Sequence, residues 1–494
     1  MRPGLCTLRA KLYSSRPIAG GPSLHVANTV SILATRGASW SRDGYVYFAG
    51  NAASGLERVS ENGGAVEGVT TLDSARHERT HRWPQALPDG SAVLFTSDTV
   101  ASSEYYDDAR IEAVRPATGE RKTLVEGTSM ARFLPPDRLV FARGGALFAV
   151  RFDPRTLQVR GTPVVVAQGL STTVSSGAVQ FAISETGTLV WVPSQSGTGL
   201  KQLVWIDRNG GEEPLDVQAG EYAQLALSPD GRQVAIAESL PPDMSLWILD
   251  LARKSLSRLT FQGTVSNPTW TPDSARIAYG MSAAQESTTQ IVWQRADGSS
   301  AAEPMLEDTP SRPFSFSPDG RLLAFGHFDA HQADATLWLL PVGRASEAHA
   351  YPGIEASSFQ AEISPDARWI AYSSLDSGAG EVYLRPFPAG DGKWQVSTGV
   401  GHEPHWARDG SAIFYRSSSD ILRVDADLAH GVHLGMARRV GSSLFGGTVA
   451  NTFSVAADGR ILTLRHPPDV TRTSEVDLAT GWGRKVDALL AAKH

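Results

Sequence analysis

Three short segments contain residues whose types and spacing could do chemistry. The run HERTH (77–81) fits H-E-x-x-H, a zinc-hydrolase pattern that requires both histidines on one face of a helix. Trp83-Pro84 follows at once, and a proline there would stop a helix from continuing. We therefore expect this run to be a loop that connects two strands, and we expect it to bind no zinc.

The segment GTSMA (127–131) matches the nucleophile segment of subtilisin-like proteases, whose serine must begin a helix. A strand and turn, RFLPP (132–136), follow it instead, and the matching aspartate and histidine segments are absent from the sequence. The G-x-S-x-G elbow of serine hydrolases is absent as well. We therefore expect no catalytic residue, and we interpret GTSMA as a chance match.

The segment HEPH (402–405) offers two histidines and a carboxylate, which are possible ligands of a transition metal. Pro404 separates them, and strand geometry would point His402 and His405 to opposite sides. We therefore expect an aqueous loop before a strand that begins at Trp406. No metal and no cofactor are expected anywhere in the chain.

The elements that would position these residues come from a repeated hairpin. In FSPDGRLLAFG (316–326), two arms with alternating apolar residues flank Ser317-Pro318-Asp319-Gly320, four residue types that are typical of a tight turn. Related segments recur with turn positions 43 to 49 residues apart. These positions are Asp43, Asp89, Asp137, Thr186, Asp230, Asp273, Asp319, Asp366, Asp409 and Asp458. Four antiparallel strands in a unit of this length indicate one blade of a β-propeller.

We therefore predict an all-β fold, a β-propeller of four-stranded antiparallel blades with about ten repeat units. The expected parts are a remnant of an upstream blade (1–36), an incomplete N-terminal propeller of four units (37–199), a six-bladed propeller (200–470) and a C-terminal tail with a short helix (471–494). Val486, Leu489 and Leu490 could share one face of that helix. The alternative is one large ring of ten or more blades.

The overall composition restricts the possible partners. The net charge is −7 and no basic patch stands out, so we expect no nucleic acid. No run of 18 apolar residues exists, so no membrane-spanning helix is expected. The basic N-terminus lacks the apolar core of a signal peptide, and we interpret it as a truncated or internally started propeller. Five tryptophans recur at repeat positions typical of blade packing: Trp247, Trp270, Trp293, Trp338 and Trp406.

Several longer segments resemble the TolB-like (PD40, WD40-like) propeller region that follows the kinase domain of many bacterial serine/threonine protein kinases. They are RVSENGG (58–64), HRWPQALPDG (81–90), LFAVRFDPRTLQVRGTPVVVAQG (147–169), LVWIDRNG (203–210), LWILDLARKSLSRLTF (246–261) and EVYLRPFPAGDGKWQVSTGVG (381–401). The resemblance implies an extracytoplasmic propeller. The kinase signatures are absent from this sequence, so kinase activity is not implied.

The resemblance favours a non-catalytic scaffold, the sensor or protein-interaction region of a bacterial receptor-kinase-like protein. The alternative is an accessory propeller that gates or docks a separately encoded peptidase or kinase. Propellers bind partners at their axial mouths, so a protein or peptide ligand is expected there. The segments that enter the innermost strands supply the candidate binding residues, which are Tyr222, Asn267, Arg312, Gln360, His402, Glu403 and Asn451.

Overall fold

The computed structural model of the chain describes residues 4–9, 12–17, 24–28, 36–50, 54–99, 106, 109–173, 177–194, 200–240, 243–282, 289–307, 310–328, 335–354, 358–377, 380–444, 451–468 and 476–492. These residues form antiparallel sheets, two 3-10 turns (Ser74–Arg76 and Ala345–Glu347) and one α-helix, α1 (Trp482–Ala491). The predicted all-β fold is confirmed. Within the described ranges, no helix is long and apolar enough to cross a membrane.

The chain divides into two compact units. Unit 1 contains Met1–Ser196 and Thr471–His494, and unit 2 contains Gly197–Val470. The backbone therefore leaves unit 1 after Ser196 and returns to it at Thr471.

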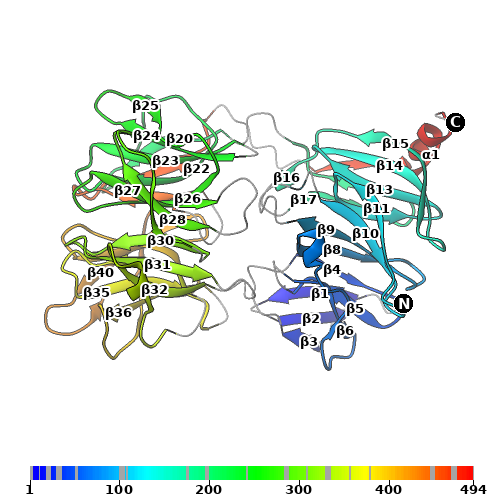
Figure 1. Cartoon of the computed structure of the whole chain (residues 1–494), viewed down its shortest axis with the longest axis horizontal. Coiled ribbons are helices and arrows are strands. Elements are labelled where there is room, and N and C mark those ends of the chain that lie inside the picture. The colour runs from blue at the N-terminus through cyan, green and yellow to red at the C-terminus, as the bar shows by residue number, and fades with distance from the viewer. Residues whose placement is uncertain are drawn as a thin grey trace. The chain divides into compact units, whose positions relative to one another are not determined.

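Unit 2 contains six sheets of four or five strands, coloured from green to orange in Figure 1. Five of them consist of strands that are consecutive in the chain. The first two sheets are β22 (Tyr222–Leu227), β23 (Gln233–Leu240), β24 (Asp243–Asp250), β25 (Ser255–Arg258), and β26 (Thr264–Trp270), β27 (Arg276–Ser282), β28 (Gln290–Arg295), β29 (Glu303–Leu306); the next two are β30 (Ser311–Phe316), β31 (Leu322–Phe328), β32 (Ala335–Pro341), β33 (His349–Ala350), and β34 (Ser358–Ile363), β35 (Trp369–Ser374), β36 (Glu381–Pro386), β37 (Trp394–Gln395). The fifth sheet is β38 (His402–Trp406), β39 (Ala412–Ser417), β40 (Asp420–Asp427), β41 (His433–Leu434), β42 (Arg438–Ser442).

The sixth sheet joins the two ends of unit 2. Its order is β21 (Glu212–Pro214), β20 (Gln202–Ile206), β44 (Ile461–Arg465), β43 (Phe453–Val455). The innermost strands β22, β26, β30, β34, β38 and β43 each contact the next, and β43 contacts β22. The innermost strands of unit 2 therefore form a closed series of contacts, which favours a separate ring in this unit over one ring through all ten repeats.

Unit 1 contains the remaining sheets. They are β1 (Gly4–Arg9), β2 (Leu12–Pro17), β3 (Leu24–Asn28); β4 (Ala38–Trp40), β5 (Tyr45–Phe48), β6 (Glu57–Ser60), β7 (Glu67–Gly68); β8 (Glu78–Ala86), β9 (Val93–Thr99), β10 (Arg110–Val114), β11 (Arg121–Glu126); β12 (Ser129–Leu134), β13 (Arg138–Arg143), β14 (Ala146–Asp153), β15 (Gln158–Ala167); β16 (Thr172–Thr173), β17 (Ala178–Val179); and β18 (Phe181–Ile183), β19 (Leu189–Trp191), β45 (Asp477–Ala479). Whether β1 to β3 are the remnant of an upstream blade stays a prediction.

The C-terminal segment packs into unit 1, although the sequence suggested a separate tail. Strand β45 extends the sheet of β18 and β19, and helix α1 follows it directly. The predicted apolar face of α1 is confirmed: Val486 and Leu490 are buried, and Leu489 packs against the same core, in which Val166 of β15 lies. The indole nitrogen of Trp482 donates to the carbonyl of Val166 at 3.3 Å. The segment folds back because its apolar stripe has a partner surface in unit 1.

The predicted hairpin turn is confirmed between β30 and β31. Asp319 accepts hydrogen bonds from the Ser317 hydroxyl at 2.6 Å and from the Arg321 amide at 3.1 Å. Gly320 has a φ of 71°, a backbone conformation that favours glycine. The same arrangement recurs around Asp230, where Ser228 and the Arg232 amide donate. These aspartates therefore have a structural role.

Two of the repeated tryptophans connect neighbouring innermost strands. Trp270 and Trp406 are buried, and their indole nitrogens donate to the carbonyls of Ala226 and Glu362 at 2.9 and 3.0 Å. The other three tryptophans are partly buried against the cores between sheets. The prediction that they pack the blades is therefore confirmed.

Candidate functional site

A cavity of about 340 Å³ lies in unit 2, where the C-terminal ends of all six innermost strands converge. Its volume falls at the lower end of the range of ligand pockets, about 300–1,000 Å³. Prolines and apolar side chains form most of the wall, including Leu227, Phe316, Trp406 and Val455. Side-chain and backbone groups together expose polar and apolar surface in about equal parts, so the wall is amphipathic.

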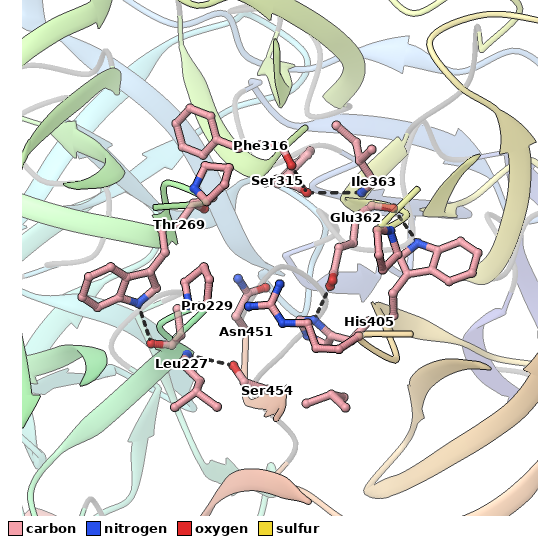
Figure 2. Close-up of a pocket in the computed structure, with 18 of the residues that line it drawn as sticks. Leu227, Pro229, Thr269, Ser315, Phe316, Glu362, Ile363, His405, Asn451 and Ser454 are labelled. Atoms are coloured by element: carbon pink, nitrogen blue, oxygen red, sulfur yellow. Dashed lines mark hydrogen bonds and ion pairs between the residues drawn. The ribbon is translucent and has the colours of Figure 1, made fainter. Parts of the chain in front are cut away.

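One residue of each innermost strand occupies an equivalent position in this wall, four residues before the turn aspartate. The six residues are Ala226, Thr269, Ser315, Glu362, His405 and Ser454. Four of them are small, whereas Glu362 and His405 come from the neighbouring strands β34 and β38. Figure 2 shows these two side chains together on one side of the cavity, with Thr269 and Pro229 on the opposite side. Glu362 and His405 thus place two ionisable side chains on the same side of the cavity.

Glu362 and His405 form an ion pair, with 2.6 Å between the Glu362 Oε2 and the His405 Nδ1. The His405 Nε2 lies 3.8 Å from the Glu403 Oε1, too far for a hydrogen bond but close enough for electrostatic attraction. Burial lowers the pKa of His405, but the two carboxylates outweigh burial and raise the pKa to about 9. His405 is therefore a cation at neutral pH, and Glu362 compensates its charge.

Glu403 is buried beneath His405 and has its own partners. Its Oε2 accepts from the Arg416 Nε at 2.9 Å and from the Thr452 hydroxyl at 2.8 Å. Its Oε1 accepts from the backbone amides of Thr452 and Phe453, the latter at 3.0 Å. The side chains of Glu403 and Arg416 are both fully buried. Because these bonds join β38 and β39 to β43 and the residue before it, Glu403 holds neighbouring sheets together.

Three of the candidate residues, Asn267, Gln360 and Glu403, occupy β-bulges with φ between 51° and 56°. The Gln360 Oε1 accepts from the Glu403 amide at 3.0 Å, and Gln224 accepts likewise from the Asn267 amide at 2.6 Å. All three candidates are buried. These contacts connect successive innermost strands, so their direct contribution is to the ring.

The other four candidates have different surroundings. Tyr222 is buried and donates to the Gln218 carbonyl at 2.7 Å. Arg312 lies over the Phe328 ring at 5.2 Å. His402 is buried, and burial lowers its pKa to about 4. Of the seven candidates, Asn451 alone lines the described cavity. A direct contact between any of them and a ligand stays a prediction.

The expectation of an aqueous loop at HEPH is wrong. Residues His402–Trp406 form β38, and His402 is only 5% exposed. The bulge between His402 and His405 changes the usual alternation of side chains. Instead of a shared metal site, the two histidines have separate partners: His402 stacks on Phe359, and His405 pairs with Glu362.

The expected loop at HERTH is also corrected, because β8 begins at Glu78. His77 is exposed in a left-handed conformation, whereas His81 is fully buried and bonds Thr70 and Glu78. Burial would raise the pKa of Glu78, but hydrogen bonds from His81 and Arg121 lower it well below its usual value. The two histidines therefore do not converge.

The GTSMA segment leads into β12, and Ser129 begins that strand, not a helix. In the part of the chain that the structure describes, no group of three or more His, Cys, Asp or Glu side chains is placed to hold a metal. The absence of metals and cofactors from the whole chain stays a prediction.

The sequence reasoning missed Glu362, His405 as a cavity residue, and Arg408. Arg408 lines the cavity at the turn position that Pro229 and Pro318 occupy in other repeats. The signal was available as a departure from the repeat: a small residue is replaced by Glu or His, and a proline by Arg. It was overlooked because the search considered where innermost strands begin, whereas the cavity lies where they end.

No protein-family model matches the sequence, and no curated protein matches it either. Among solved structures, the chain is similar to a putative TolB from Agrobacterium tumefaciens, with 16% identity, 55% of this chain and 99% of that chain covered, and a TM-score of 0.44. For TolB from Acinetobacter baumannii these values are 14%, 70%, 80% and 0.34. For the propeller domain of the trilobed protease from Pyrococcus furiosus they are 12%, 73%, 97% and 0.33. Likenesses this distant say nothing about activity, ligand or partner.

Proposed function

We propose that this protein is a non-catalytic binding propeller, and that unit 2 is a six-bladed ring that takes a peptide segment of a partner protein in its axial cavity. The supporting observation is the cavity wall, to which all six innermost strands contribute apolar side chains and which also contains three ionisable residues, Glu362, His405 and Arg408. A wall of this kind can desolvate apolar side chains of a ligand, and its polar groups can fix the orientation of that ligand.

The chemistry of the cavity favours binding over catalysis. His405 has its Nδ1 on Glu362, and its Nε2 is buried and points toward Glu403. A general base needs a nitrogen that can reach a substrate proton. The lining residues also include no cysteine, and the lining serines Ser315 and Ser454 bond backbone groups of neighbouring strands.

The biological setting is proposed from the sequence resemblance. The chain would be the sensor or protein-interaction region of a bacterial receptor-kinase-like protein. The second candidate is an accessory propeller that docks a separately encoded peptidase or kinase. A pull-down with the cavity-blocked variant described next as control would identify the partner class and separate the two candidates.

A random 12-residue peptide library displayed on phage tests the binding function. The library is panned on the wild-type chain and on Asn451→Trp, because Asn451 lines the cavity and its side chain makes no hydrogen bond with the described residues. Ala252→Trp places the same bulk at an exposed turn and is the matched control. We expect peptides that bind wild type and Ala252→Trp but not Asn451→Trp. Equal recovery on all three proteins, or no recovery, would contradict the proposal.

A further inference from the structure

The ionisable side chains that line the axial cavity carry more positive than negative charge. Glu362, His405 and Arg408 are the ionisable residues that line the cavity. The pKa of His405 is raised to about 9, so two of these three side chains are cations and one is an anion at neutral pH. The buried pair of Glu403 and Arg416 adds no net charge. The cavity is thus positive within a chain whose net charge is −7.

Arg408 supplies the uncompensated charge. Its guanidinium makes no hydrogen bond or ion pair with any residue that the structure describes, and the residue is exposed. Two arginines that follow a turn aspartate by two residues differ in this respect, because Arg368 and Arg460 pair with the aspartates of their own turns at 2.7 and 2.8 Å. The N–H donors of the Arg408 guanidinium are therefore available to bind a ligand.

The position of Arg408 in the repeat also separates it from residues that serve the fold. Pro229, Pro272, Pro318 and Pro365 stand at this position in four other turns. Proline presets the backbone angle of such a turn, so an arginine there gives up a conformational advantage. Glu362, which also lines the cavity, can accept a further hydrogen bond, since its Oε1 has no partner within the described part of the chain.

We propose, on the basis of the proposed binding function, that the axial cavity of unit 2 selects acidic peptide segments. An Asp or Glu side chain, or a C-terminal carboxylate, pairs with the Arg408 guanidinium. An amide of the same segment donates to the Glu362 Oε1, and the apolar wall receives the neighbouring side chain. A guanidinium is suited to this role because it binds a carboxylate through two parallel hydrogen bonds.

The test compares the peptides that the 12-residue phage library yields on four proteins: wild type, Arg408→Gln, Arg408→Glu and Arg321→Gln. Arg321 is an exposed arginine at another turn and does not line the cavity, so it is the matched control. Wild type and Arg321→Gln should select peptides enriched in Asp and Glu. Synthetic copies of these acidic peptides should bind Arg408→Gln about two- to fivefold more weakly than wild type, as expected for the loss of one exposed ion pair. Arg408→Glu should select Lys- and Arg-containing peptides instead.

The two proposals fail differently. Peptides that require the open cavity but show no acidic preference would overturn the selection of acidic segments and leave the binding function intact. An acidic preference that persists in Arg408→Glu would do the same, because it would place the recognition elsewhere. The absence of any cavity-dependent peptide would contradict the binding function and, with it, the acidic preference. The salt dependence of binding gives a second readout. When the salt concentration is raised from about 0.05 to about 0.5 M, the affinity of wild type for acidic peptides should fall, and that of Arg408→Gln should fall less.

Discussion

Replacement of Glu403 by alanine should destabilise unit 2 without a direct effect on ligand contacts. The carboxylate accepts from the Arg416 guanidinium, from the Thr452 hydroxyl and from the amides of Thr452 and Phe453. Alanine removes both carboxylate oxygens and therefore every one of these hydrogen bonds. Breaking a buried ion pair costs about 3–5 kcal/mol, because the remaining charge stays buried without a partner. We therefore expect a loss of about 4 kcal/mol from the free energy of unfolding.

Differential scanning calorimetry of the full chain measures this effect. One kcal/mol lowers the melting temperature of a domain of 150–250 residues by about 2–4 °C, so a loss of about 4 kcal/mol in Glu403→Ala should lower the transition of unit 2 by about 8–16 °C. Gln360→Ala is the matched control, because Gln360 occupies the equivalent bulge and its Oε1 accepts from the backbone amide of Glu403, whereas no carboxylate is lost. Its expected cost is about 1–2 kcal/mol. Adding Arg416→Leu to Glu403→Ala should recover part of the loss, since the unpaired charge is then removed.

A melting temperature of Glu403→Ala within about 2 °C of wild type would refute this reasoning, because a buried guanidinium that loses its carboxylate has to cost more than that. If such a variant also lost peptide binding, Glu403 would belong to the binding site, as the sequence analysis suggested. Retained binding at a temperature well below the melting transition is the expected result.

Three further outcomes are expected. His405→Gln should change how the stability of the protein depends on pH. Because the pKa of His405 is raised to about 9, its protonation contributes stability that is complete below about pH 6.5 and is lost as the pH rises through 9. The melting temperatures of wild type and variant, measured by circular dichroism, should therefore converge by about pH 10. Gly320→Val should cost about 1–3 kcal/mol in urea unfolding, because its φ of 71° is strained for valine while the nearest atom to an added Cβ is 3.8 Å away; Gly320→Asn should cost less, and equal costs would contradict a purely conformational cause. Leu490→Ala should lower the free energy of unfolding of unit 1 by about 2–5 kcal/mol, because it removes a large buried side chain. Lys485→Ala, on the exposed face of α1, should lower it by less than about 0.5 kcal/mol. If Leu490→Ala shifts only the thermal transition that Glu403→Ala also shifts, the assignment of α1 to unit 1 would be contradicted.

The repeat made the fold predictable from the sequence. A turn such as Ser317-Pro318-Asp319-Gly320 depends on local forces: proline presets φ, the aspartate binds nearby amides, and glycine accepts a positive φ. The apolar alternation of the flanking strands is local too. These preferences act within about ten residues, so they are legible in a single sequence, and their recurrence indicated a propeller. The apolar face of α1 was predictable for the same reason.

The site depended on contacts that the sequence does not reveal. Glu362 and His405 are 43 residues apart in the chain, and only the packing of β38 against β34 brings their side chains to 2.6 Å. The segment around Glu403, which we expected to be a loop, is a buried strand with a bulge. The Glu403 carboxylate accepts hydrogen bonds there from Arg416 of β39 and from the amide of Phe453 at the start of β43, and the sequence does not reveal these partners. The return of α1 to unit 1 similarly depends on a partner surface formed by β15, more than 300 residues earlier in the chain. Sequence periodicity specifies which elements form, whereas the charge of a side chain, its burial and its partners are set by the elements that fold against it.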